Sequence, residues 1–190
     1  MSLVVAVKDG DRVYMGADTQ TTFGNTVIRR PKLKEGCLKI TKMPNGVLLG
    51  HTGKLNCAQR LTTQKAWFEN LPEEGLTKKF LVQEIVPKFK DNIKAVNGLD
   101  KNGGAGCSFI VAWKDRLFLL ENDFSVFEIA DYIAIGTPDY AHYALMQVHQ
   151  PARERLLSAL ETASTFSTTV SAPHVLADSK DLALEFVEGK

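Results

Sequence analysis

The sequence predicts an α+β fold in which two mostly antiparallel sheets lie between two layers of helices, an αββα sandwich. Strand-like and helix-like segments come in separate blocks, in the order strands, helices, strands, helices, strands. Segregated blocks are typical of layered α+β folds and not of doubly wound parallel sheets. Two helical blocks and about ten strands suffice to cover both sheets. The 190 residues, 44% of them hydrophobic, favour one domain over residues 1–190 that needs no disulfide or metal to stabilise it.

Charge and cysteine content exclude several classes of protein. The chain has 23 basic and 22 acidic residues, a formal net charge of +1, so it carries neither a polybasic nucleic-acid arm nor a strongly acidic tail. Cys37, Cys57 and Cys107 are odd in number and form no CxxC pair, which indicates reduced thiols and a cytosolic location. No apolar run approaches the ~18 residues that span a bilayer. We therefore expect no nucleic-acid or membrane partner.

The first hairpin begins at the second residue of the chain, without a signal peptide. Residues 3–8 and 13–17 are rich in strand formers and are separated by a turn at 9–11. Centring the turn on Gly10 pairs residues whose numbers sum to 20. The apolar face then contains the pairs Leu3–Ala17, Val5–Met15 and Val7–Val13. The same register places Ser2 opposite Asp18, with Cβ atoms ~5 Å apart.

The remaining elements follow from hydrophobic periodicity. A second hairpin is expected from 38–43 and 47–50. Helices are expected over 55–71 and over 77–96, with a kink or break at Pro87, before a glycine-rich loop at 102–106. The later segments are strands at 108–113, 117–121, 126–129 and 132–135, helices at 140–148 and 152–164, and strands at 175–177 and 182–187.

Most residues that could form a metal site, a nucleophile elbow or a phosphate-binding loop lack the spacing that such a site requires. The four histidines, His51, His142, His149 and His174, lack the spacing of a metal site, so we expect structural or surface histidines and no metal. No G-x-S-x-G nucleophile elbow is present. The glycines at 103, 104 and 106 lack the ending of a phosphate-binding loop, so no cofactor is expected.

The N-terminal residues form the one cluster with catalytic potential. A hydroxyl residue at the start of a chain can use its own α-amine, whose pKa is near ~8, as the general base. Ser2 qualifies once Met1 is removed, Asp18 can orient the amine, and a nearby lysine can lower the proton affinity of the nucleophile. The alternative interpretation is a polar residue at a frayed end and an aspartate that ends a strand.

Four segments, in order, resemble the β-type subunits of proteasomes and their smaller bacterial relatives, which are N-terminal nucleophile hydrolases. They are 5–10 with 16–26, 38–43, 49–53 and 131–137. The resemblance extends from residue 2 to about residue 178 and implies the αββα fold, peptidase activity, a homo-oligomeric ring that hides the sites in a chamber, and service by an ATP-driven unfoldase. The resemblance implies no metal and no cofactor.

The resemblance also implies roles for individual residues. Ser2 takes the position of the nucleophile, which is usually threonine in this family. Asp18 takes the acidic position and Lys39 the lysine position. Gly53 would donate the backbone N–H of the oxyanion hole. Thr137 falls where the family has a serine near the nucleophile's amine.

The lysine assignment has an alternative. Counting from Ser2 favours Lys34, whereas the strand and turn context favours Lys39, with about five residues inserted before it. We prefer Lys39 because a strand holds a side chain in place better than the loop at 29–36. The pocket side chains are expected from Thr21, Thr22 and the 45–53 region.

Four features depart from the family pattern. Serine replaces threonine at the nucleophile, Pro138 follows Thr137 where the family has Gly-Ser-Gly, and 168–171 lacks the aspartate of the usual Asp-x-x-Ser. Met1 precedes the nucleophile and must be removed for catalysis. Three hypotheses follow: a serine-type N-terminal nucleophile endopeptidase, a catalytically degenerate structural subunit of the same fold, and an amidase that acts on a small amide.

Overall fold

The computed structural model describes residues 2–23, 26–28, 38–137, 141, 144–146 and 149–189. Its first sheet has the strand order β10-β1-β2-β11-β12. These strands are β1 (Leu3–Asp9), β2 (Arg12–Asp18), β10 (Tyr132–Gly136), β11 (His174–Asp178) and β12 (Glu185–Val187), and each pair of neighbours is antiparallel. Two short strands, β3 (Thr21–Phe23) and β4 (Thr26–Ile28), extend beyond β2 as a separate ribbon.

The second sheet has the order β5-β6-β7-β8-β9 and is also antiparallel throughout. Its strands are β5 (Ile40–Lys42), β6 (Leu48–Gly53), β7 (Cys107–Trp113), β8 (Arg116–Leu120) and β9 (Val126–Ile129). A short 3₁₀ turn, η2 (Pro44–Gly46), connects β5 to β6.

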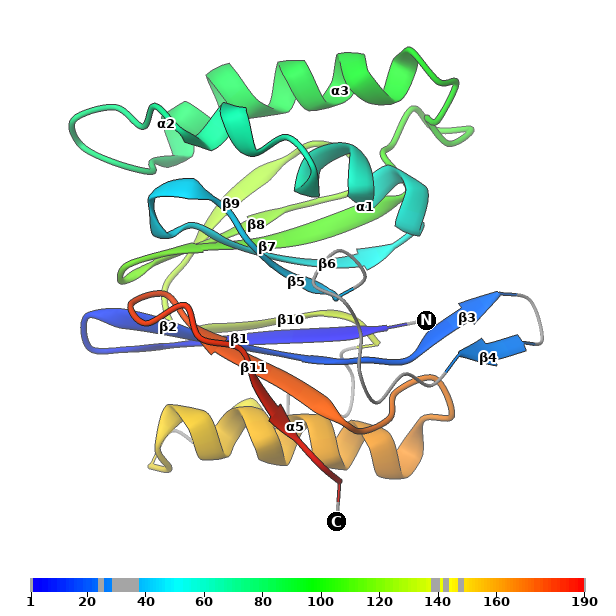
Figure 1. Ribbon diagram of the computed structural model, residues 1–190, viewed down its shortest axis with the longest axis vertical. Helices are drawn as coiled ribbons and strands as arrows, with labels where there is room; N and C mark the ends of the chain where they lie inside the picture. Colours follow the sequence, from blue (N-terminus) through cyan, green and yellow to red (C-terminus); the bar gives the residue numbers. More distant parts are fainter. Residues whose placement is uncertain are drawn as a thin grey trace.

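Helices cover the outer face of each sheet (Figure 1). On the second sheet lie α1 (Leu55–Thr62), the 3₁₀ turn η3 (Lys65–Phe68), α2 (Lys78–Phe80), the π-helical turn η4 (Leu81–Ile85) and α3 (Val86–Lys94). On the first sheet lies α5 (Ala152–Phe166). The order helix, sheet, sheet, helix confirms the αββα fold that the sequence predicts. No helix among the described residues combines the length and apolar character that crossing a membrane requires.

Three apolar cores separate these layers. One lies between the second sheet and helices α1 and α3 and includes Phe89 and Phe109, which pack edge to face. A second lies between the first sheet and α5 and includes Leu3 and Leu160. The third fills the space between the two sheets. Since both sheets are buried on both faces, their strands carry apolar residues on both sides.

The predicted register of the first hairpin is wrong by one residue. The observed pairs have numbers that sum to 21, from Val4 opposite Ala17 to Asp9 opposite Arg12. The reason is the turn, which is a two-residue Gly10–Asp11 connection with Gly10 at φ 59° and not a three-residue turn centred on Gly10. Apolar pairing does not select the register here, because both faces of β1 are buried and apolar.

Two helical predictions also differ from the structure. The helix expected over 55–71 ends at Thr62, and the chain continues into η3. Pro87 does not break the following helix: the π-helical turn η4 immediately precedes α3, in which proline stands in the first turn, where its missing N–H is tolerated. The helix expected over 140–148 lies mostly outside the described residues, of which Ala141, Ala144 and Leu145 are helical.

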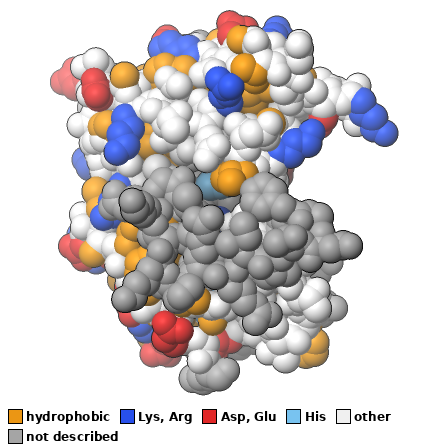
Figure 2. Space-filling model, turned by 45° about the vertical axis from the view of Figure 1, so that its right-hand side comes forward, with side chains coloured by type: hydrophobic (Ala, Val, Ile, Leu, Met, Phe, Trp, Pro, Cys, Tyr) orange, Lys and Arg blue, Asp and Glu red, His pale blue; other side chains and the backbone are white. Residues whose placement is uncertain are grey.

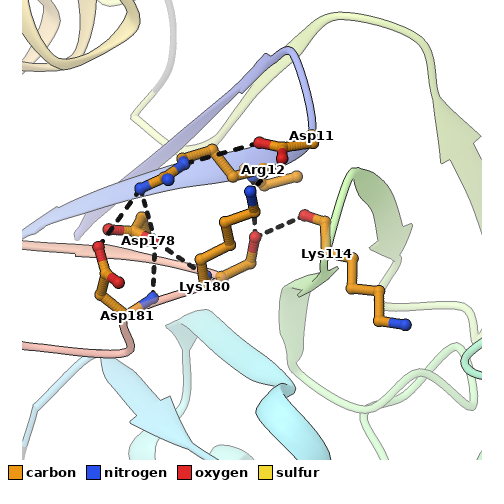
Figure 3. Close-up of polar contacts among 8 residues, drawn as sticks. Asp11, Arg12, Lys114, Asp178, Lys180 and Asp181 are labelled. Atoms are coloured by element: carbon orange, nitrogen blue, oxygen red, sulfur yellow. Dashed lines mark hydrogen bonds and ion pairs between the residues drawn. The ribbon is translucent and has the colours of Figure 1, made fainter.

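Charged side chains join three turns at the end of the sandwich opposite Ser2 (Figure 3). Arg12 at the start of β2 forms ion pairs with Asp178 at 3.5 Å and Asp181 at 3.3 Å, and Lys180 pairs with Asp11. Below them, the buried Ser179 hydroxyl accepts the N–H of Val13 and donates to the carbonyl of Lys114. This network fixes the β1–β2, β7–β8 and β11–β12 connections relative to one another.

Candidate active site

The ends of strands from both sheets meet at the end of the sandwich where the chain begins (Figure 1). Ser2 directly precedes β1, and Asp18 is the last residue of β2. Gly53 ends β6 and Gly136 ends β10, while Lys39 directly precedes β5. Strand ends from two sheets therefore bring together residues that are up to 134 positions apart (136 − 2).

A buried ion pair joins the two sheets at this end. Lys39 Nζ lies 2.6 Å from Asp18 Oδ2, and the two side chains are 8% and 0% exposed. The Asp18 carboxylate also accepts the backbone N–H of Leu3 at 2.8 Å and that of Gln20 at 3.0 Å. Because Leu3 follows Ser2 directly, the carboxylate holds the backbone that carries the predicted nucleophile.

Burial changes the pKa of both members of the pair. Loss of hydration raises the pKa of Asp18, and the Lys39 ammonium and the two N–H donors oppose that rise. Loss of hydration also lowers the pKa of Lys39, against the attraction of Asp18. A lysine with a lowered pKa in contact with an oriented carboxylate is suited to promoting ionisation of a neighbouring hydroxyl.

Ser2 and Gly53 line the same hollow, which has a volume of about 420 Å³. The other residues of its wall are Thr52, Asp100, Gly106, Cys107, Ser108, Asn122 and Gly136. Figure 2 shows the molecule turned toward this end, where a histidine side chain is visible beside a hydrophobic one near the middle of the face. A hollow of this kind can admit one or two peptide side chains beside the Ser2 hydroxyl.

Two glycines are required by the geometry of this hollow. Gly53 has φ 97°, and a Cβ there would lie 2.5 Å from the carbonyl oxygen of Gly106. Gly136 has φ 100°, and a Cβ there would lie 2.0 Å from the carbonyl oxygen of Ser2. Both positions therefore exclude side chains, which lets neighbouring backbone segments approach closely at this end of the sandwich.

Thr137 forms a backbone hydrogen bond with Ser2. Its backbone N–H donates to the Ser2 carbonyl at 3.0 Å. Its hydroxyl is buried and has no hydrogen-bond partner among the described residues. An unpaired buried hydroxyl next to Ser2 is suited to accept a hydrogen bond from an α-ammonium group. Pro138, which follows it, lies outside the described residues.

The structure thus brings together Asp18 and Lys39 in direct contact, Ser2 and Gly53 in one hollow, and Thr137 on the Ser2 backbone. The register expected to place Ser2 opposite Asp18 is wrong by one residue, so that Leu3 stands there. Lys34, the alternative lysine, lies outside the described residues. Their catalytic roles stay predictions.

The pocket residues are predicted only in part. Of the 45–53 region, Thr52 and Gly53 line the hollow of Ser2, whereas Asn45 lines a separate hollow beside Trp113. Thr21 does not line the Ser2 hollow, and the side chain of Thr22 lies outside the described part of the structure. The residues between positions 100 and 122 that line the hollow are not predicted from the sequence, because they carry no motif. They reach the site only through the pairing of β6 with β7.

Two buried histidines near the ion pair were also not assigned a place in the site. His51 lies on β6, where its N–H donates to the Lys39 carbonyl at 2.9 Å, and burial lowers its pKa to about 4. His174 lies opposite Asp18 on the neighbouring strand, and burial lowers its pKa as well. Both Nδ1 atoms are buried without a hydrogen-bond partner among the described residues. Their strand pairing with Lys39 and Asp18 is the signal that could have found them.

The segment that lacks the expected aspartate lies close to β2. Gln20 Nε2 donates to the carbonyl of Thr168 at 3.0 Å, and the Thr19 hydroxyl donates to that of Pro173 at 2.8 Å. Ser171 lines a second hollow, of about 530 Å³, with Gln20 and His174. Backbone carbonyls of this segment, and not a carboxylate, therefore support the residues that follow Asp18.

Comparison with known proteins gives partial sequence matches and complete structural ones. No family model matches the chain. ATP-dependent protease subunits HslV from Caldanaerobacter subterraneus and Thermoanaerobacter pseudethanolicus are 36% and 35% identical over 92 residues, which is 47% of this chain and 49% of each relative. The chain thus matches about half the length of these relatives. HslV from Caldicellulosiruptor saccharolyticus is 29% identical over 132 residues, 69% of this chain and 68% of that one.

Solved structures match over nearly the whole chain. The ancestral β-subunit Anbu from Yersinia bercovieri has a TM-score of 0.74 at 14% identity, covering 98% of this chain and 87% of that one. BPH from Thiobacillus denitrificans, in complex with epoxomicin, has a TM-score of 0.74 at 17% identity, covering 95% and 99%. HslV from Trypanosoma brucei has a TM-score of 0.71 at 17% identity, covering 93% and 98%. The chain therefore shares its fold with Anbu, BPH and HslV, and about half of its length is similar in sequence to HslV protease subunits.

Proposed function

We propose that this chain is a proteasome-like endopeptidase whose nucleophile is the hydroxyl of Ser2 after removal of Met1. The observation that carries the proposal is the buried Asp18–Lys39 pair, 2.6 Å apart, whose carboxylate also binds the N–H of Leu3. It lies at the end of the sandwich where Ser2 and Gly53 share a hollow. Matches to HslV protease subunits support the same reaction.

In the proposed reaction, Ser2 Oγ attacks the carbonyl carbon of a peptide bond, and its proton passes to the neutral α-amine of Ser2. The oxyanion accepts a hydrogen bond from the Gly53 N–H. Collapse breaks the C–N bond, and the α-ammonium protonates the leaving amine. Water then hydrolyses the acyl-ester, with the amine again taking the proton. Lys39 favours ionisation of Ser2 Oγ by its charge, Asp18 orients the N-terminal backbone, and Thr137 accepts a hydrogen bond from the α-ammonium.

The assembly and its location are part of the same proposal. HslV relatives are subunits of an ATP-dependent protease, which supports a homo-oligomeric ring with an ATP-driven unfoldase as partner and unfolded protein as substrate. A cytosolic location agrees with the cysteines, since Cys57 and Cys107 are both free and buried.

The second candidate function is a non-catalytic structural subunit of the ring. Two features of the sequence favour it: Met1 precedes Ser2, and Thr168 stands where the family has an aspartate. An amidase that acts on a small amide has the same fold and chemistry, and differs only in substrate.

Intact-mass measurement of the natively expressed protein separates these candidates first. The peptidase requires a mass without Met1, and a retained Met1 would overturn it in favour of the structural subunit. The processed protein should then be labelled by an electrophile that reacts with N-terminal hydroxyl groups, and Ser2→Ala should not. Ser158→Ala, on α5 away from the hollow, is the matched control and should be labelled like wild type. Cleavage of small amides without cleavage of peptides would favour the amidase.

A further inference from the structure

The wall of the hollow beyond Gly53 is polar, although the face between the sheets is otherwise apolar. Thr52 on β6 lies opposite Ser108 on β7, and both line the hollow that contains Ser2. Ser108 Oγ donates to Glu121 Oε2 at 2.9 Å, and Glu121 is the residue directly after the end of β8. We refer to Ser108, Glu121, Asn122 and Asp100 as the acceptor wall, for the reason given below.

The hydrogen bonds within the acceptor wall occupy the Ser108 hydroxyl and one N–H of the Asn122 amide as donors. The Ser108 hydroxyl donates to Glu121, and one N–H of the Asn122 amide donates to Asp100 Oδ2 at 3.1 Å. The backbone N–H of Gly106 donates to Asn122 Oδ1. Oxygen lone pairs of Ser108 and Asp100 remain for a ligand. A group that supplies hydrogen-bond donors can therefore bind to these oxygen atoms.

The charges of the acceptor wall also favour a ligand with hydrogen-bond donors. Asp100 lines the hollow, and the Asn122 amide and the backbone N–H groups of Gly104 and Asn102 lower its pKa, so its carboxylate stays ionised. Glu121 adds a second carboxylate behind Ser108. Two ammonium groups oppose these charges: Lys54, whose stem packs against Gly106, and Lys101, which follows Asp100. Both lysines are exposed, whereas Asp100 and Glu121 are half-buried, so solvent screens the ammonium groups more than the carboxylates.

We infer that the acceptor wall selects peptides with a lysine or arginine side chain next to the scissile bond. The inference rests on the proposed peptidase function and names its substrate class. A basic side chain that enters the hollow supplies hydrogen-bond donors to the free oxygen lone pairs and a positive charge next to Asp100. A glutamate side chain in the same place would meet the like charge of Asp100, which is unfavourable.

The test uses quenched fluorogenic peptides in which arginine, norleucine or glutamate is moved through three positions on each side of the bond. At one of these positions, kcat/KM for the arginine peptide should exceed kcat/KM for the glutamate peptide about tenfold. The Asp100 charge should account for a factor of about five in this ratio. Asp100→Asn, which keeps an oxygen for the N–H groups of Asn102 and Gly104, should lower this ratio about fivefold. Lys54→Gln should raise it.

Asp115→Asn, in the β7–β8 turn at the far end of the sheet, is the matched control and should leave the ratio unchanged. If Asp100→Asn does not fold, Glu121→Gln replaces it, since glutamine can still accept the Ser108 hydroxyl. A ratio near one in wild type, a preference for glutamate, or an equal ratio in Asp100→Asn would overturn the inference.

A measurement of peptide binding distinguishes failure of this inference from failure of the proposed peptidase function. Fluorescence anisotropy with Ser2→Ala should show tighter binding of the labelled arginine peptide than of its glutamate counterpart, and Asp100→Asn should reduce the difference. Selective binding without any cleavage by the processed wild type would overturn the peptidase function alone. Cleavage with equal binding of both peptides would overturn the acceptor wall alone.

Discussion

Replacing Lys39 by methionine tests whether the buried pair is ionised. The substitution removes the ammonium group 2.6 Å from Asp18 Oδ2 and keeps an apolar stem of similar length. The Asp18 side chain is fully buried, so its charge would lose its only cationic partner among the described residues. Breaking a buried pair on one side costs about 3–5 kcal/mol. Lys39→Met should therefore lower the free energy of unfolding by that amount near pH ~7.5.

The pH dependence of this loss has a definite sign. Without the ammonium group, the pKa of Asp18 rises further above its unfolded value of about 3.9. The folded variant then binds a proton more tightly than the unfolded chain, so acidification through the raised pKa stabilises the variant. The stability difference between wild type and Lys39→Met should consequently shrink as the pH falls from about 7.5 to about 5.

Urea denaturation of both proteins at one protein concentration, at each pH, measures the difference. Lys42→Met is the matched control, because Lys42 lies at the other end of β5 and forms no ion pair in the described part of the structure. It should cost less than about 1 kcal/mol. A loss below about 1 kcal/mol for Lys39→Met near neutral pH, or a gap that widens on acidification, would refute the ionised pair.

Two further predictions concern stability. Ser179→Ala leaves the buried N–H of Val13 without an acceptor and the partly buried carbonyl of Lys114 without a donor. The free energy of unfolding in urea should therefore fall by about 1–3 kcal/mol, and a loss equal to that of Ser158→Ala would contradict this. His51 has a folded pKa of about 4 against 6.5, so the unfolded chain binds the extra proton between these values. Stability should fall by about 3 kcal/mol from pH ~6.5 to pH ~4, and thermal melts of His51→Gln should show a flatter profile; equal profiles would exclude His51 as the cause.

Patterns along the chain predict the layers better than they predict the contacts between strands. Segregated blocks and apolar periodicity are local properties, and they yield the αββα order that the structure confirms. The register of β1 with β2 depends instead on one turn: because Val4 and Val5 are both buried, each on its own face of the sheet, either register pairs apolar residues. Only the two-residue connection at Gly10 decides between them.

The candidate site was predictable where its residues stand at strand ends. Asp18 and Lys39 each adjoin a strand whose position the apolar pattern indicates, and the structure places the two side chains in contact. The acceptor wall was not predictable, because Asp100 and Asn122 flank the β7–β8 hairpin without any motif and reach the hollow only through the pairing of β7 with β6. His51 was overlooked because a single histidine in an apolar run is usually a core residue.

The position of the buried pair is itself an argument for function. The face between the sheets is an apolar core, and an apolar pair of similar volume in place of Asp18 and Lys39 would avoid the desolvation of two charges. Replacing a buried ion pair in this way is often neutral or stabilising. Fold stability therefore does not require these charges between the sheets. Their carboxylate instead accepts the backbone N–H of Leu3, the residue that follows Ser2. That contact is what the proposed activation of Ser2 requires, and it gives the pair a role that fold stability does not.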